Sequence, residues 1–190
     1  MAIRQPAWIS ADVFEAFLAR PENCNWNYEL INGTIVEKKW RTWDRAVVVS
    51  LLAFALGDCV RRNGLGIPAI KRPVCLPDDP FNYRFIDVSV VLDPSYRINK
   101  SGPCRVMPEV IAEVKPCTER YQKLRHKAHF YLSGGAKLVW LVFPGKHTVE
   151  VYRPEMPVIT LNSENLLEGY DVLPGFSVPV RELFPETHGG

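Results

Sequence analysis

Two apolar runs with charged residues inside them decide the fold: Phe85-Ile-Asp-Val-Ser-Val-Val-Leu92 and Val110-Ile-Ala-Glu-Val-Lys115. Both runs are rich in β-branched residues, so each predicts a strand. A buried strand normally excludes charge, because an unpaired ion in a low-dielectric interior is very costly. Asp87, Glu113 and Lys115 must therefore be compensated by a metal ion, by one another, or by water at a sheet edge.

These three residues suggest a chemistry. Side chains alternate along a strand, so Glu113 and Lys115 are expected to point the same way, about 7 Å apart. Asp87, Glu113 and the backbone carbonyl of Val114 supply oxygen ligands of the kind that Mg²⁺ takes, and Mn²⁺ is the alternative ion. Lys115 would then orient the attacking water or stabilise charge on phosphorus. A metal ion beside a cationic group is the chemistry of phosphodiester cleavage. The alternative is an edge strand with solvated charges, which the Glu-x-Lys spacing alone favours.

Composition limits the class of protein. With 190 residues, of which 47% are apolar and 23% charged, the chain can form one domain with a core and is short for two. We expect a single domain over residues 1–190, with its core roughly at 26–153. Net charge is +2, which permits a nucleic-acid substrate without arguing for one.

The sequence lacks the patterns of a membrane span, a signal peptide and a paired-cysteine site, and these bear on where the protein is expected and on its cysteines. No apolar run approaches the roughly 20 residues of a membrane span. The first residues lack a signal-peptide pattern, so we expect no membrane association and a cytoplasmic location. The five cysteines are odd in number and scattered, so neither a zinc site nor a disulfide framework is expected.

The remaining sequence predicts a mixed α/β (α+β) domain. Asn32-Gly33 is a strong turn signal and predicts a hairpin over 28–39. The segment over 109–143 reads as strand–helix–strand, so its two strands are expected to be parallel and adjacent, and the rest of the sheet largely antiparallel. The other predicted elements are helices over 9–20, 44–62 and 118–132 and strands over 69–76, 137–143 and 148–153.

Two further charged groups are candidates. Glu29 precedes the hairpin turn and could be another acid facing the site; a half-exposed strand glutamate is the alternative, which the sequence alone favours. Lys123 and Lys127 share a helix face. They could bind phosphate or form the solvated side of the helix, and the sequence does not choose between these.

Other patterns favour ordinary roles. His126 and His129 are three residues apart, but no third histidine lies nearby, so we expect surface or packing roles. The aromatic stretch 40–43 could stack on bases, although hairpin packing is the better interpretation. No nucleophile elbow or Gly-rich phosphate loop is present, so a small-molecule hydrolase or transferase ranks last.

Seven motifs occur in a recognisable order. They are Tyr28-Glu-Leu-Ile-Asn-Gly-Thr-Ile-Val-Glu37, Ile86-Asp-Val-Ser-Val-Val91, Glu113-Val-Lys115, Lys127-Ala-His-Phe-Tyr131, Trp140-Leu-Val142, Val149-Glu-Val-Tyr-Arg153 and Leu173-Pro-Gly-Phe176. Over roughly residues 8–184 the chain resembles the Uma-two family of bacterial restriction-endonuclease-like proteins, part of the PD-(D/E)XK nuclease superfamily.

The resemblance implies a fold and a set of roles. The fold would be a restriction-endonuclease-like mixed sheet flanked by helices, with additional N-terminal and C-terminal hairpins, and often a homodimer. Asp87 matches the motif aspartate and Glu113 the paired acid. Glu29 matches the N-terminal acid, and Lys127 the lysine on the following helix.

The chain also departs from the family pattern. Ile86 replaces the proline before the aspartate, and Lys115-Pro-Cys-Thr118 replaces the usual Ser-Pro-Ser/Thr, which restores a Glu-x-Lys. Asp44 stands where the family has a histidine before the long helix. Lys137-Leu-Val-Trp140 replaces an acid–aromatic pair, and Phe143-Pro144 replaces Asp-Pro. These departures indicate an altered substrate or partner.

Two hypotheses follow. The first is a Mg²⁺- or Mn²⁺-dependent endonuclease that hydrolyses DNA through Asp87, Glu113 and Lys115, with help from Glu29 and Lys127. The second is a catalytically silent nuclease-fold protein that acts as a DNA-binding or dimeric interaction module. Metal-dependent stability and cleavage distinguish the two.

Overall fold

The structure is a computed structural model that describes residues 8–23, 28–38, 42–98 and 102–185. The chain forms two compact units. The smaller comprises Met1–Trp40, Arg72–Phe85 and Arg97–Val106, and the larger comprises Arg41–Lys71, Ile86–Tyr96 and Met107–Gly190. The expectation of one domain stays a prediction. Among the described residues, no helix is both long and apolar enough to cross a membrane.

The smaller unit is built on the predicted hairpin. Strands β1 (Tyr28–Ile31) and β2 (Thr34–Glu37) pair antiparallel. Asn32 and Gly33 connect them with φ of 47° and 71°, the positive values that a two-residue hairpin turn requires. Asn82 holds this turn from outside, because its side-chain oxygen accepts the backbone N–H of Asn32 at 3.1 Å. The hairpin prediction is confirmed.

A small apolar core fastens the other elements of this unit. Helix α1 (Ala11–Leu18) is shorter than the predicted 9–20, and a single 3-10 turn, η1 (Pro21–Asn23), follows it. Leu30 exchanges two backbone hydrogen bonds with Tyr83, each 3.0 Å long. The buried apolar residues of this core are Ala11, Phe14, Leu30, Cys75, Tyr83 and Phe85.

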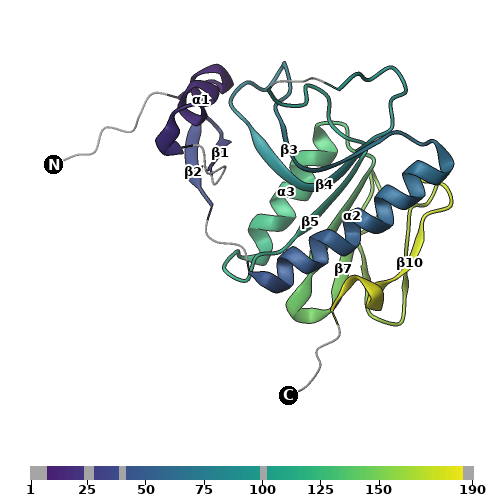
Figure 1. Ribbon diagram of the computed structural model, residues 1–190. Helices are drawn as coiled ribbons and strands as arrows, with labels where there is room; N and C mark the ends of the chain where they lie inside the picture. The colour runs from purple at the N-terminus through teal and green to yellow at the C-terminus, as the bar shows by residue number, and fades with distance from the viewer. Residues whose placement is uncertain (1–7, 24–27, 39–41, 99–101, 186–190) are drawn as a thin grey trace. The chain divides into compact units, whose positions relative to one another are not determined.

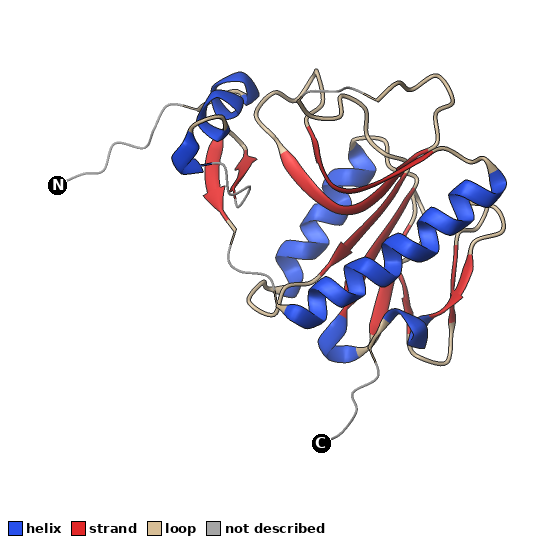
Figure 2. Cartoon of the chain, viewed as in Figure 1, coloured by secondary structure: helices blue, strands red, loops and turns tan. Residues whose placement is uncertain are grey.

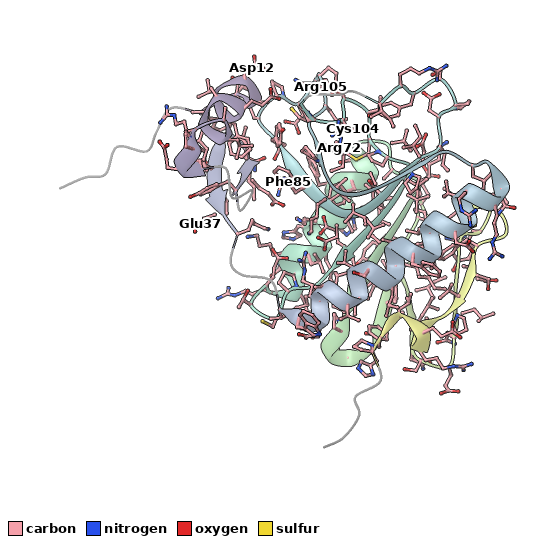
Figure 3. All side chains as sticks on the ribbon, in the orientation of Figure 1. Asp12, Glu37, Arg72, Phe85, Cys104 and Arg105 are labelled. Atoms are coloured by element: carbon pink, nitrogen blue, oxygen red, sulfur yellow. The ribbon has the colours of Figure 1, made fainter. Side chains whose placement is uncertain are left out.

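A buried thiol, that of Cys75, belongs to this core. The Arg105 guanidinium is 3.5 Å from the Cys75 sulfur and 3.6 Å from the Glu15 carboxylate. Figure 3 labels Arg105 beside its neighbour Cys104. Burial raises the pKa of the Cys75 thiol, although Arg105 opposes the shift. The described cysteines Cys59, Cys75, Cys104 and Cys117 are free thiols.

The central sheet has the strand order β3-β4-β5-β6-β7-β8. Figure 2 shows the strands of the chain in red. Strands β5 and β6 are parallel and adjacent, as predicted from the crossover, and the pairs β4–β5, β6–β7 and β7–β8 are antiparallel. Its strands are β3 (Ile67–Val74), β4 (Arg84–Val91), β5 (Val110–Val114), β6 (Leu138–Phe143), β7 (Thr148–Tyr152) and β8 (Ile159–Leu161). The mixed, largely antiparallel sheet is therefore confirmed.

Two helices flank this sheet in the larger unit (Figure 1). Helix α2 (Trp43–Asn63) covers one face with an apolar stripe, and Gly64 ends it in the left-handed conformation. Helix α3 (Tyr121–Ser133) covers the other face and connects β5 to β6. It begins three residues later than predicted, because a turn from Pro116 to Glu119 comes first and Arg120 takes the N-cap position.

The C-terminal segment completes the core on the α2 side. Strands β9 (Leu166–Glu168) and β10 (Ser177–Pro179) form the expected C-terminal hairpin. Two 3-10 turns complete the elements, η2 (Pro144–Lys146) and η3 (Val180–Leu183). The buried residues shared by this core include Leu52, Val88, Ala112, Trp140, Val151, Leu167, Phe176 and Leu183.

Candidate active site

The candidate site lies where β4 and β5 stop pairing. Their registered pairs run from Val90 opposite Val110 to Val88 opposite Ala112. Just beyond this point the backbone N–H of Val114 donates to the Asp87 carboxylate at 2.9 Å. Asp87 is fully buried. The two strands therefore separate at Asp87, a side chain of β4 that accepts a hydrogen bond from the backbone of β5.

Arg45 of α2 binds this aspartate directly. Its Nη2 lies 2.6 and 2.5 Å from the two carboxylate oxygens of Asp87, and its Nε donates to the Val114 carbonyl at 2.8 Å. Its side chain is only 9% exposed. One guanidinium thus contacts two of the three oxygen groups that the sequence predicted as metal ligands.

A second cation reaches Asp87 from β3. The ammonium of Lys71 forms an ion pair with the carboxylate and is partly open to solvent. Lys71 has φ of +53° inside a strand, in the region that non-glycine residues seldom adopt. Such backbone strain persists only where the surroundings enforce it, and it clusters at functional sites.

Glu113 is held from the other face of the sheet. Lys127 of α3 lies 3.1 Å from Glu113 Oε1, and the hydroxyl of Tyr131 donates to the same oxygen at 2.6 Å. All three residues are buried. Lys127 and Tyr131 are four apart and share a face of α3. The structure thus brings Lys127 to Glu113, and the hydroxyl of Tyr131 was not anticipated from the sequence.

We call these groups the Asp87–Glu113 cluster. It comprises Asp87, Glu113, Arg45, Lys71, Lys127, Tyr131 and the Val114 carbonyl. Counted as ionised groups, two carboxylates face three basic side chains, so the cluster carries a formal excess of one positive charge.

Lys115 points elsewhere. Strand β5 ends at Val114, although the Lys115 backbone N–H still donates to the Val142 carbonyl of β6 at 2.8 Å. Its ammonium donates to the Pro116 carbonyl at 3.0 Å and lies 4.6 Å from the centre of the Tyr121 ring. The ammonium of Lys146 lies 4.5 Å from the same ring. The predicted role of Lys115 at the nucleophile stays a prediction.

Glu29 belongs to the smaller unit. It is buried rather than half-exposed, and it lies 3.2 Å from the Lys38 ammonium and 3.9 Å from the Arg84 guanidinium. The alternative considered above, a half-exposed strand glutamate, is therefore wrong. Its role as a further acid at the site stays a prediction.

The remaining candidates have ordinary surroundings. His126 and His129 are exposed, and the ring of His129 packs edge-on against Tyr152 at 5.7 Å between centroids. Trp43 is exposed at the start of α2, whereas Lys39, Trp40 and Arg41 lie outside the described residues.

The ligand types at the cluster fit a hard divalent cation, but their present partners compete with it. Carboxylate and carbonyl oxygens are what Mg²⁺ takes. Arg45 contacts both Asp87 and Val114, and Lys127 and Tyr131 contact Glu113. Among the described residues, no group of three His, Cys, Asp or Glu side chains converges as a ready-made site. A divalent ion therefore fits only when Arg45 withdraws.

Arg45 and Lys71 were missed, for different reasons. Arg45 precedes Val48, Val49 and Leu52 by three, four and seven residues, so it lies on the apolar stripe of α2. A basic residue in the first turn also opposes the helix dipole, a signal that could have revealed it. Lys71 gave no such signal, because its positive φ depends on tertiary surroundings.

A second buried carboxylate lies on the α3 side of the sheet. Glu150 of β7 accepts two hydrogen bonds from Arg125, at 3.0 and 2.5 Å, and one from the Tyr152 hydroxyl at 2.8 Å. Burial alone would raise the pKa of Glu150, but Arg125 and Tyr152 outweigh it and hold the pKa below its ordinary value. This Glu150 clamp fastens α3 to the sheet.

The sequence matches a known protein family over most of its length. Residues 14–181 match the Uma2 family, described as "Putative restriction endonuclease". The chain belongs to the Uma2 family. No curated protein matches the sequence significantly.

A solved structure supports the same fold. It is a putative nuclease belonging to DUF820 from Anabaena variabilis ATCC 29413, with 18% sequence identity and a TM-score of 0.78. The match covers 93% of this chain and 97% of that one. The restriction-endonuclease-like fold predicted for this Uma2 member is therefore confirmed, whereas the identity is too low to transfer any residue's role.

Proposed function

We propose that this Uma2 member is a Mg²⁺- or Mn²⁺-dependent endonuclease that hydrolyses DNA phosphodiester bonds at the Asp87–Glu113 cluster. The observation that carries the proposal is the buried Asp87 carboxylate, which two basic side chains bind where β4 and β5 part. A second buried carboxylate, Glu113, is next in sequence to the Val114 that hydrogen-bonds to Asp87, and a third basic side chain, Lys127, contacts it. Membership of a family described as "Putative restriction endonuclease" supports the same reaction and DNA as the substrate.

The chain's own residues have separate roles in the proposed hydrolysis. Arg45 and Lys71 can exchange the Asp87 carboxylate for a phosphate oxygen, because guanidinium and ammonium groups bind both kinds of anion. Lys127 and Tyr131 fix the orientation of Glu113 through two contacts to one oxygen. A bound divalent ion would polarise the phosphate and activate water. Lys115 and Glu29 keep their proposed assisting roles.

Nicking of supercoiled DNA tests this function. The full chain is incubated with plasmid in Mg²⁺, Mn²⁺ and EDTA, beside Asp87→Asn and the control Asp58→Asn. Asp58 lies on the same long helix as Arg45 but pairs with the exposed Arg61 and Arg62. Nicking that needs metal, persists in the control and is lost in Asp87→Asn supports the proposal. Equal nicking by all three proteins contradicts it.

A second candidate function is a silent nuclease-fold module that binds DNA. The hold of Arg45 and Lys71 on Asp87 favours it, since a permanently neutralised carboxylate takes no metal. Its signature is DNA binding without cleavage, and a thermal midpoint that Mg²⁺ does not raise.

We also propose a homodimer, as the resemblance implies. Light scattering after size exclusion measures the mass in solution. A mass of twice the 21.6 kDa chain supports the dimer, and the mass of one chain contradicts it.

A further inference from the structure

We infer that Arg45 is a built-in competitor of the divalent cation, holding Asp87 and the Val114 carbonyl closed until it is displaced. This inference rests on the proposed metal-dependent function, but it concerns binding rather than cleavage. Its basis is a set of contacts to one guanidinium.

The guanidinium takes the position that a shared ion would take. It joins a carboxylate on β4 to a backbone carbonyl on β5, with contacts of 2.5 to 2.8 Å. The carboxylate is fully buried and the arginine nearly so. A metal ion that used the same two oxygen groups would have to occupy the same space, so binding of one excludes the other.

The charge around Asp87 adds to this exclusion. Arg45 and Lys71 together bring two positive charges to one carboxylate. An incoming divalent ion would meet net repulsion at a buried site, where charges are poorly screened. Removing the positive charge of Arg45 therefore frees the ligands and lowers the repulsion together.

Arg45 can also leave Asp87 for another anionic partner. It lies in the first turn of α2, where the helix dipole disfavours a cation. A phosphate oxygen would offer its fork of donors an equivalent partner. In the proposed nuclease, DNA would draw Arg45 away from Asp87 and thereby raise the affinity for metal.

Binding of Mn²⁺, followed in the absence of DNA by the electron paramagnetic resonance of the free ion, tests the inference. The proteins are the unsubstituted chain, Arg45→Gln, Arg62→Gln and the double variant Arg45→Gln/Asp87→Asn. Arg62 is an exposed arginine of the same helix and serves as the matched control.

Arg45→Gln is expected to bind Mn²⁺ at least about tenfold more tightly than the unsubstituted chain. Arg62→Gln should match the unsubstituted chain, and the double variant should lose the gain. An affinity in Arg45→Gln no higher than in the unsubstituted chain overturns the inference, as does a gain that survives in the double variant.

A second variant serves if Arg45→Gln does not fold. Arg45→Lys keeps a positive charge for Asp87 but lacks the fork of donors that joins Asp87 to the Val114 carbonyl. Tighter Mn²⁺ binding by Arg45→Lys than by the unsubstituted chain supports the inference, and unchanged binding overturns it. These readouts do not depend on cleavage, so a failed nicking assay refutes the proposed function without touching them.

Discussion

Asp87 and Glu150 are both buried carboxylates of the central sheet, and each binds an arginine from a flanking helix. Arg45 is 9% exposed and also binds a backbone carbonyl, whereas Arg125 is 50% exposed. Glu150 has a second donor in Tyr152, from its own strand. Asp87 has a backbone N–H and a strained lysine. The same pair of residue types thus forms an internal, strained cluster in one place and a solvent-facing clamp in the other.

The difference indicates separate roles. A clamp open to water fastens a helix at low cost, because its arginine stays largely hydrated. Moving both charges of a buried ion pair out of water costs much of the free energy that their attraction gains. Such a pair is therefore weak support for stability, and we infer that it is retained for another reason. We attribute the Asp87 pair to function and the Glu150 clamp to architecture.

The largest expected effect is that of Arg45→Ala. It leaves the buried Asp87 without its main partner, so the free energy of unfolding should fall by about 3–5 kcal/mol. Urea denaturation measures the fall. Arg62→Ala on the same helix should change it by less than about 0.5 kcal/mol. A loss under about 1 kcal/mol in Arg45→Ala would remove the contrast with the clamp.

Asp87→Asn tests the same pair from the acidic side. An amide keeps a hydrogen-bond acceptor but not the charge, so two cations lose their anion. We expect a loss of about 2–4 kcal/mol in the free energy of unfolding, by the same denaturation. The double variant Arg45→Ala/Asp87→Asn should be more stable than the sum of the single losses implies. Simple additivity would show that the two residues are not coupled.

Arg125→Ala should cost less. Water can replace a half-exposed guanidinium, and Tyr152 still donates to Glu150, so the expected loss is about 1 kcal/mol. Thermal or urea unfolding measures it. A loss as large as that of Arg45→Ala would mean that the clamp is as desolvated as the cluster.

The smallest effect depends on pH. The folded pKa of Glu150 is lowered, so its charged form stabilises the fold above the unfolded pKa of about 4.3, and this contribution disappears as pH falls through the folded pKa. Glu150→Gln should therefore be less stable than the unsubstituted chain at pH 7 and approach it near pH 3. Melting temperatures between pH 3 and 7 measure the gap. A gap independent of pH would contradict the assignment.

The sequence predicted the fold more fully than the cluster. Periodicity and turn chemistry located the long helix, the Asn32-Gly33 hairpin and the parallel β5–β6 pair, because these depend on local pattern and on the crossover rule. It also indicated that Asp87 needs a partner. It did not identify that partner, since Arg45 lies 42 residues away in the chain.

The positions of the cationic side chains could not be predicted from local sequence. Lys115 was expected beside Glu113 from strand alternation, but its ammonium contacts the Pro116 carbonyl and the Tyr121 ring. Lys127 reaches Glu113 from a helix instead, at a distance of 14 residues in sequence. Lys71 depends on a positive φ that no sequence signal announces. Each of these placements is set by tertiary packing.

Cleavage of supercoiled DNA by Glu113→Gln and Glu150→Gln, assayed together with the unsubstituted chain in Mg²⁺ or Mn²⁺, tests the central claim most directly. Both variants neutralise a buried glutamate on the α3 side of the sheet. Loss of cleavage in Glu113→Gln, with activity retained within about threefold in Glu150→Gln, is the predicted result. Equal cleavage by the two variants would contradict the assignment of the reaction centre to the Asp87–Glu113 cluster.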